Sequence, residues 1–136
     1  MYQLLRSKAI SQKLAWIKEQ SISKGKSILD YGSGTGEFLN YCAHKGWEVK
    51  GVEIAEGPRK NSIENYGLNV VTPGEFNSTR DQQFDVVSMW HVLEHLDQLN
   101  LTVKKVATRL KANGLFVLAL PNPESWDATH YKECWA

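Results

Sequence analysis

Hydrophobic residues recur along the chain at two spacings, one typical of helices and the other of buried strands. Over residues 4–20, isoleucines and leucines lie at helical spacing with lysines between them, which predicts an amphipathic first helix. The same pattern predicts further helices over residues 37–45, 58–67 and 97–111. Shorter apolar runs predict five strands, over residues 27–30, 47–54, 68–71, 84–89 and 115–120.

The alternation of strands and helices predicts the class of fold. Residues 115–120 are apolar without interruption, which is typical of a strand that helices cover on both faces, as in a parallel sheet. Strand and helix alternate five times, so we expect an α/β, doubly wound, Rossmann-like sheet of about five mostly parallel strands in the order 3-2-1-4-5. Pro73-Gly74 is expected to form a turn after the third strand, and Asn113-Gly114 to end the helix over residues 97–111.

Composition and charge narrow the class of protein. The chain has 136 residues, of which 42% are hydrophobic and 23% are charged, as in an ordinary globular domain. These values exclude a disordered tail, a collagen-like fibre and a coiled coil. Sixteen lysines and arginines balance fifteen acids to give a formal charge of +1, which argues against a nucleic-acid partner bound through its phosphates.

The apolar runs and the cysteines bear on cellular location. No apolar run approaches the roughly 20 residues that span a bilayer, and the N-terminus lacks the long apolar stretch of a signal peptide. We therefore expect no membrane association. Cys42 and Cys134 do not form a CxxC pair, which argues against a disulfide framework or a structural zinc site. The chain is predicted to be a reduced, cytoplasmic protein.

The first predicted strand runs directly into a glycine-rich loop, Asp30-Tyr31-Gly32-Ser33-Gly34-Thr35-Gly36. Glycines are needed where a loop turns tightly and its backbone approaches a ligand without an intervening Cβ atom. In open α/β sheets ligands bind at the carboxyl ends of the strands, which is where this loop lies. Asp30, at the end of the strand, adds a carboxylate that could hold a cation or an ammonium group.

The spacing of the glycines separates two classes of cofactor. A dinucleotide-binding loop has the pattern G-x-G-x-x-G and holds a pyrophosphate at the N-terminus of the next helix. Here the pattern is G-x-G-x-G, and Glu37 stands at the third glycine position, where its carboxylate would repel a pyrophosphate but not a positive sulfonium. Glu53 ends the second predicted strand, where an acid accepts hydrogen bonds from both hydroxyls of a ribose.

Four segments within residues 26–125 carry a resemblance to a known family. The glycine loop and the strand before it look like the first motif of the class I S-adenosylmethionine-dependent methyltransferases, and Glu53 matches that family's ribose-binding acid. Residues 83–95 resemble the fourth-strand motif, and residues 110–117, followed by Pro121-Asn122, resemble the fifth-strand motif. The resemblance is closest to the broad branch that includes ubiquinone-biosynthesis-type and other small-molecule methyltransferases.

The resemblance implies S-adenosyl-L-methionine as the cofactor, S-adenosyl-L-homocysteine as its product, and a small-molecule methyl acceptor. It places Glu53 on the ribose and Ile54 on the adenine, and it places Gly74-Glu75-Phe76 at the adenine edge. Met89 and Trp90 fall where the fourth strand opens onto the methyl group. The cofactor-binding residues predicted in this way are Asp30, Gly32, Ser33, Gly34, Gly36, Glu53, Ile54, Glu75, Phe76, Met89 and Trp90.

The segment His91-Val92-Leu93-Glu94-His95 allows other interpretations. It satisfies H-x-x-E-H, a zinc-protease pattern, but a catalytic zinc needs a third protein ligand, and the remaining histidines lie in no obvious ligand pattern. We therefore expect no metal. His91 or His95 could act as a general base, because imidazole titrates near working pH. Alternatively, Glu94 and His95 hold the corner after the strand by hydrogen bonds.

The family's core has seven strands, and this sequence supplies five. We therefore expect a C-terminally truncated chain with an N-terminal helical segment (1–25), an S-adenosylmethionine-binding domain (26–125) and a C-terminal tail (126–136). The fifth strand would then be an edge through which copies of the chain could pair. Two alternatives stay open: an NAD(P)-dependent oxidoreductase on the same fold, and a non-catalytic module that keeps the cofactor pocket for an interaction.

Overall fold

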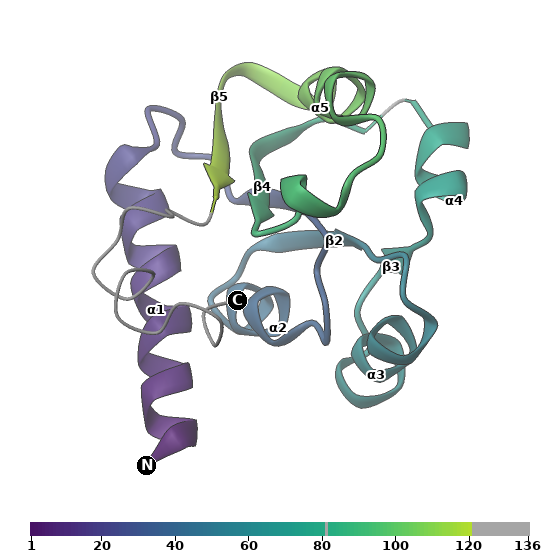
Figure 1. The fold of residues 1–136 in the computed structure, drawn as a ribbon. Coiled ribbons are helices and arrows are strands. Elements are labelled where there is room, and N and C mark those ends of the chain that lie inside the picture. The colour runs from purple at the N-terminus through teal and green to yellow at the C-terminus, as the bar shows by residue number, and fades with distance from the viewer. Residues whose placement is uncertain (81, 121–136) are drawn as a thin grey trace, which may run out of the picture.

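The computed structural model describes residues 1–80 and 82–120, in which parallel strands form one five-stranded sheet (Figure 1). The strands are β1 (Ser27–Tyr31), β2 (Glu48–Val52), β3 (Val70–Val71), β4 (Phe84–Trp90) and β5 (Leu110–Ala119). They lie in the order β3-β2-β1-β4-β5, so the predicted doubly wound fold and its strand order are confirmed. The predicted tail, residues 126–136, and the Pro121-Asn122 pair lie outside the described residues.

Helices cover both faces of the sheet. The helices are α1 (Tyr2–Gln20), α2 (Glu37–His44), α3 (Glu56–Tyr66), α4 (Pro73–Ser78) and α5 (Leu99–Ala107), and a 3-10 turn, η1 (Leu93–His95), follows β4. Side chains from α1 and α2 join one buried cluster, and side chains from α4 and α5 join another on the opposite face. Within the described part of the chain, no helix is long and apolar enough to span a bilayer.

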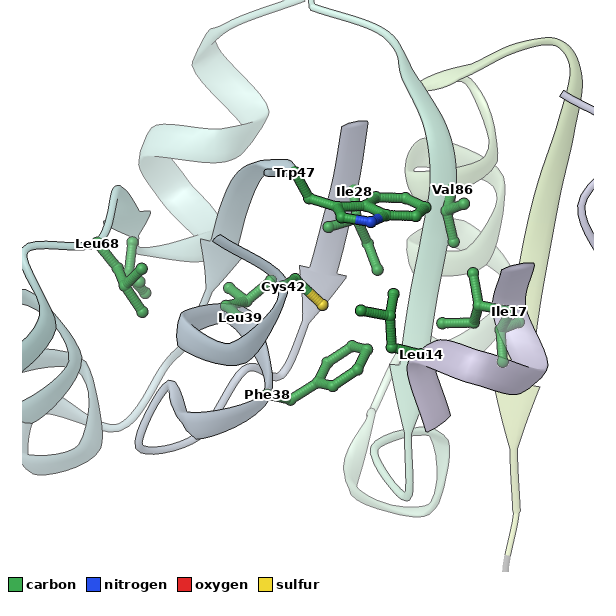
Figure 2. Close-up of a cluster of buried hydrophobic side chains, with 11 residues drawn as sticks. Leu14, Ile17, Ile28, Phe38, Leu39, Cys42, Trp47, Leu68 and Val86 are labelled. Atoms are coloured by element: carbon green, nitrogen blue, oxygen red, sulfur yellow. The ribbon is translucent and has the colours of Figure 1, made fainter. Parts of the chain in front are cut away.

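The first cluster ties the N-terminal helix to the sheet (Figure 2). Leu14 and Ile17 are the buried residues of α1, and they pack in the cluster that includes Phe38 and Cys42 of α2 and Ile28 of β1. Burying a leucine or isoleucine side chain contributes roughly 1.5–3 kcal/mol. These two residues therefore hold the second half of α1 on the core and place its neighbouring side chains near the end of β1.

The short helix α4 corrects one prediction. Pro73-Gly74 was expected to turn out of the third strand, but Pro73–Ser78 is helical. The Thr72 side chain accepts a hydrogen bond from the backbone N–H of Glu75, and the Glu75 carboxylate accepts one from the backbone N–H of Thr72. This capping box satisfies backbone groups at the helix start, and proline at the first position suits a helix that begins there.

The Asn113-Gly114 pair corrects a second prediction. It was expected to end the helix over residues 97–111, but α5 ends at Ala107 and the pair lies inside β5. Phe84 pairs with Leu110 and Val86 with Leu115, so extra residues of β5 bulge out between these two pairs. A Cβ atom on Gly114 would lie 2.9 Å from the Lys111 carbonyl oxygen, and this crowding explains why glycine stands in the bulge.

The strand register brings the carboxyl ends of three strands to one edge. Asp30 of β1 lies opposite Gly51 of β2 and Ser88 of β4, and Tyr31 lies opposite Val52. The segments that follow β1, β2 and β4 therefore leave the sheet side by side. These three segments contain the glycine loop, Glu53 and the His91 segment of the sequence analysis.

At the opposite, amino edge of the sheet, Asp85 holds the strand ends together. Its carboxylate accepts hydrogen bonds from the backbone N–H of Ser27 at 3.1 Å, the Ser27 hydroxyl at 2.6 Å and the Ser23 hydroxyl at 3.0 Å. Lys111 donates to the same carboxylate at 3.3 Å. A Cβ atom on Gly25 would lie within 2.5 Å of this carboxylate, so the chain passes as close as glycine allows.

Replacing Asp85 by alanine is expected to lower the free energy of unfolding by about 2 kcal/mol, because the buried donors of Ser27 lose their acceptor. Urea unfolding at neutral pH measures the change. Lys111→Met is the control, since the Lys111 side chain is 47% exposed and its ion pair contributes little. An Asp85→Ala variant as stable as the parent would contradict the role assigned to this carboxylate.

Candidate functional site

The candidate site lies at the carboxyl edge of the sheet, where the chain leaves β1. Strand β1 pairs with β2 on one side and with β4 on the other, so the connections diverge at this strand. Such switch points of open parallel sheets are the places where ligands bind. The predicted glycine loop lies there, between the end of β1 at Tyr31 and the start of α2 at Glu37.

The three glycines of the loop are needed for different reasons. Gly32, Gly34 and Gly36 have φ angles of 82°, 57° and 85°, a region that side chains with a Cβ atom rarely adopt. A Cβ atom would lie 2.3 Å from the Val92 side chain at Gly32 and 2.5 Å from that of Ser62 at Gly36. At Gly34 such an atom would have no neighbour within 4 Å among the described residues. The backbone of Gly34 is therefore the part of the loop open to a ligand.

Glu53 links the end of β2 to the glycine loop. Its residue is 9% exposed, and its carboxylate accepts a hydrogen bond from the backbone N–H of Gly34 at 2.7 Å and from that of Ala55 at 2.9 Å. The two bonds use different carboxylate oxygens, and each oxygen has further lone pairs to offer. The carboxylate thus fixes the loop and can still accept hydrogen bonds from a pair of ligand hydroxyls.

Asp30 places a second, fully buried carboxylate beneath the same loop. It is 3% exposed, and the Ser88 hydroxyl donates a hydrogen bond to it at 2.7 Å. Burial raises its pKa to about 6, even though the hydrogen bond from Ser88 and the positive charge of Lys13 act in the opposite direction. A positive group on a bound ligand would stabilise the charged form of Asp30.

A cavity of about 470 Å³ opens beside Glu53, a size suited to a small ligand or part of a cofactor. Its lining residues come from the carboxyl ends of β1, β2 and β4 and from the segments that follow these strands and β3. They are Tyr31, Gly32, Val52, Glu53, Ile54, Pro73, Trp90, His91, Val92, His95 and Leu96.

The structure brings some of the predicted site residues to this cavity and leaves others out of it. Those that line it are Gly32, Glu53, Ile54, Trp90, His91 and His95. Phe76 and Met89 are buried in the core and do not line the cavity, and Glu75 caps α4. Pro73, the first residue of α4, and Leu96, which follows η1, line the cavity but were missed, because a single apolar residue outside a strand carries no signal in the sequence.

Two further predicted residues belong to the loop itself. Gly36 packs against Ser62 of α3 and is the N-cap of α2, so it shapes the loop rather than facing the cavity. The Ser33 hydroxyl is buried and has no hydrogen-bond partner within the part of the chain that the structure describes. A Cβ atom on Gly51 would lie 2.7 Å from this oxygen, so the hydroxyl is directed at β2 rather than into a cavity.

The two histidines lie in the corner after β4. His91 has a φ of 53°, which is uncommon for a residue with a side chain, and its backbone N–H donates to the Ala119 carbonyl at 2.9 Å. The nearest atoms of the His95 imidazole and the Glu94 carboxylate are 3.9 Å apart, too far for a hydrogen bond. Backbone bonds such as that from His95 N–H to the Val92 carbonyl hold the corner. Among the described residues, no three potential ligands are close enough to bind a metal ion.

These features define a Rossmann-like domain with a site at the carboxyl edge of its sheet. The backbone of Gly34 is open, and the Glu53 carboxylate accepts a hydrogen bond from its N–H. Glu37 is the first residue of α2, so the N-terminus of this helix carries an acid where a dinucleotide's pyrophosphate would bind. The Glu37 carboxylate forms an ion pair with Arg6 at 2.6 Å. The acidic groups around the loop therefore fit S-adenosylmethionine, which has a ribose and a positive sulfonium but no pyrophosphate.

The chain belongs to the methyltransferase domain family, whose sequence pattern matches residues 2–136. This membership confirms the predicted family. The chain is 29% identical over 121 residues to the ubiquinone biosynthesis O-methyltransferase of Stutzerimonas stutzeri, covering 82% of this chain and 52% of that protein. It is 33% identical over 109 residues to the protein of the same name from Azoarcus, covering 75% and 47%. The chain thus spans about half the length of the curated relatives it matches.

Solved structures agree with this assignment. A SAM-dependent methyltransferase from Archaeoglobus fulgidus superposes with a TM-score of 0.72 at 30% identity, covering 88% of this chain and 55% of that one. A SAM-bound amino pentose methyltransferase from Micromonospora echinaspora gives a TM-score of 0.73 at 19% identity, covering 88% of this chain and 52% of that one. The second likeness shows the shared fold alone. These comparisons favour methyl transfer over the NAD(P)-dependent oxidoreductase considered above.

Proposed function

We propose that the protein transfers a methyl group from S-adenosylmethionine to a small-molecule acceptor. The observation that carries the proposal is the Glu53 carboxylate, which is buried beside the open backbone of Gly34 and bonded to the N–H of that residue. A loop held in this way by a ribose-binding acid suits a nucleoside cofactor, and membership of the methyltransferase domain family supports the reaction.

Each predicted group has a separate task in this proposal. S-adenosylmethionine supplies a methyl group on a positive sulfonium, so that the leaving sulfur departs uncharged. Glu53 accepts hydrogen bonds from the ribose hydroxyls, and Ile54, which is 80% exposed, offers an apolar surface for the adenine. The buried charge of Asp30 favours the positive end of the ligand. These residues bind and orient, and such positioning lowers the barrier of a displacement without a metal.

The acceptor would bind against the wall of the cavity formed by the corner after β4. Trp90, His91 and His95 line the cavity there, and the imidazoles are bases that can take the proton of an acceptor hydroxyl. Relatives that are named as O-methyltransferases support a hydroxyl as the acceptor group. The cytoplasmic location and the pairing of copies through β5 stay predictions.

Calorimetric titration with S-adenosylhomocysteine tests the cofactor assignment. We expect a dissociation constant in the micromolar range and no detectable binding of NADH under the same conditions. Binding of NADH with no binding of S-adenosylhomocysteine would favour the oxidoreductase. Binding of neither ligand by a chain with the circular dichroism of a folded α/β protein would overturn the proposal. Binding of S-adenosylhomocysteine without transfer to any hydroxyl acceptor would favour the non-catalytic module.

A further inference from the structure

A second cavity, of about 490 Å³, lies between α4 and α5 on the face of the sheet that these helices cover. Cationic side chains line it from two directions. Arg80 follows α4, Lys104 and Lys105 belong to the last turn of α5, and Arg109 lies between α5 and β5. We call this cavity the basic groove. Among the described residues that line it, none is an acid.

The charge of the basic groove is not balanced within residues 1–80 and 82–120. Arg80, Lys104 and Lys105 are exposed, and none of them forms an ion pair with a described residue. Asp81 follows Arg80 in the sequence and lies outside the described residues, and even its single charge would leave the groove positive. A chain with a formal charge of only +1 therefore concentrates positive charge at this place.

Arg109 is the buried member of this set. It is 5% exposed, and its guanidinium Nη2 donates a hydrogen bond to the Phe76 carbonyl at 2.8 Å. The centre of the same guanidinium lies 4.4 Å from the centre of the Phe76 ring. These contacts fix a positive charge in the wall of the groove before any ligand binds, and a group that is already ordered loses less entropy on binding.

Helix stability explains only part of this arrangement. Cations are favourable near the C-terminal end of a helix, which accounts for Lys104 and Lys105 in the last turn of α5. It does not account for the convergence of these lysines with Arg80 from the other wall, because like charges repel one another. An anion bound between the two helices would remove this repulsion.

We propose that the basic groove binds a ligand that carries a phosphate group. The inference goes beyond the proposed function and does not depend on it. A phosphate group carries about 1.5 to 2 negative charges and three strong acceptor oxygens at neutral pH. Arginine matches such oxygens with parallel N–H donors, and lysine adds a compact charge. The groove offers both kinds of side chain, and the Asn77 amide on its wall is a neutral donor.

The basic groove is separate from the candidate site. A smaller cavity of about 190 Å³ shares Pro73 with the cavity beside Glu53 and Asn77 with the basic groove. None of the four cations of the groove lines the cavity beside Glu53. A phosphate-bearing ligand and the cofactor can therefore occupy the protein at the same time.

Calorimetric titration of the full chain with pyrophosphate tests the inference, at low ionic strength because salt screens exposed charges. We expect a dissociation constant below about 1 mM for the parent and binding at least about tenfold weaker for the double variant Lys104→Gln/Lys105→Gln. The control is Lys8→Gln/Lys24→Gln, which removes the same charge at exposed positions outside the groove and should bind like the parent. Citrate, a carboxylate anion of similar charge, should bind the parent at least about tenfold more weakly than pyrophosphate does.

Several results would overturn the inference. An equal loss of affinity in both double variants would show an effect of net charge alone, and equal affinity for citrate would show that the groove does not select phosphate. A folded parent chain that does not bind pyrophosphate would refute the site directly. Nuclear magnetic resonance of the parent locates the site without any variant, because pyrophosphate should shift the backbone amide signals of Arg80, Lys104 and Lys105. Shifts confined to other segments would also contradict the proposal.

A further measurement separates the proposal from the proposed function. Lys104→Gln/Lys105→Gln should bind S-adenosylhomocysteine with parental affinity, because neither lysine lines the cavity beside Glu53. Failure of pyrophosphate to bind would therefore leave the proposed function intact, and failure of S-adenosylhomocysteine to bind would leave the groove intact.

The same phosphate chemistry can come from a soluble ligand or from a lipid headgroup, and vesicles distinguish these sources. Cosedimentation with phosphatidylcholine vesicles that contain phosphatidic acid, lost in Lys104→Gln/Lys105→Gln, would identify a headgroup. Binding of pyrophosphate without binding of these vesicles would identify a soluble ligand. Both results support recognition of phosphate by the groove.

Discussion

Replacing Glu53 by glutamine is expected to weaken binding of S-adenosylhomocysteine by roughly 10- to 100-fold, even though the two side chains have the same size. Both carboxylate oxygens of Glu53 accept a backbone N–H, one from Gly34 and the other from Ala55. An amide has one oxygen and one NH₂ group. In any orientation of the glutamine side chain, its NH₂ group would therefore face one of the two backbone N–H groups, which cannot accept a hydrogen bond. The variant therefore disturbs the loop and also weakens the acceptor for the ribose hydroxyls.

Calorimetry with the parent chain and Glu53→Gln measures this effect, and Glu64→Gln is the matched control. Glu64 lies on α3 and is exposed, so its replacement removes the same charge without touching the glycine loop. The control should bind S-adenosylhomocysteine like the parent. Parental affinity in Glu53→Gln would show that the ribose does not depend on this carboxylate, and the site would have to be reassigned.

The fold could be predicted because it depends on patterns that recur over many residues. The uninterrupted run in β5 and the alternation of strands and helices predicted a parallel sheet and its order, and both are confirmed. Short-range features were harder to predict. The helix that begins at Pro73 depends on one capping box, and the bulge at Asn113-Gly114 depends on how β5 pairs with β4. Pro-Gly and Asn-Gly pairs are also common in turns, and only the contacts made in the folded protein distinguish a turn from a helix start or a bulge.

In the candidate site, too, some features could be predicted from the sequence and others could not. The position of Glu53 after the second strand predicted an acid beside the glycine loop, because strand ends and loops are arranged by the fold itself. Its bond to the N–H of Gly34 depends on a side-chain conformation that no spacing encodes. The place of Lys13 near Asp30 and over the Trp90 ring was not predicted, because it results from the packing of α1 through Leu14 and Ile17.

Replacing Asp30 by asparagine should stabilise the cofactor-free protein by about 3 kcal/mol at pH 7.5 and weaken its binding of S-adenosylmethionine. Burial raises the pKa of Asp30 from 3.8 to about 6, and a difference of about two pH units corresponds to about 3 kcal/mol. Asparagine carries no charge to desolvate, and its amide oxygen can still accept the hydrogen bond from Ser88.

The sign of the pH dependence follows from the proton balance. Between about pH 4 and 6 the folded protein keeps a proton on Asp30 that the unfolded chain has lost, so the free energy of unfolding of the parent falls as pH rises. Asp30→Asn lacks this dependence. Its advantage over the parent should therefore be complete above about pH 6 and vanish near pH 4.

Urea unfolding at pH 4.5, 6 and 7.5 measures these differences, and Asp85→Asn provides a control of opposite sign. Although burial alone would raise the pKa of Asp85, hydrogen bonds from Ser27, Ser23 and Lys111 hold it below its ordinary value. That carboxylate is therefore stabilising above its unfolded pKa, and its replacement should lower stability at pH 7.5. An Asp30→Asn variant that is less stable than the parent at pH 7.5 would refute the view that Asp30 is kept for its charge at a cost in stability. If the variant is more stable and binds the positive cofactor more weakly, the buried carboxylate serves ligand binding rather than the fold.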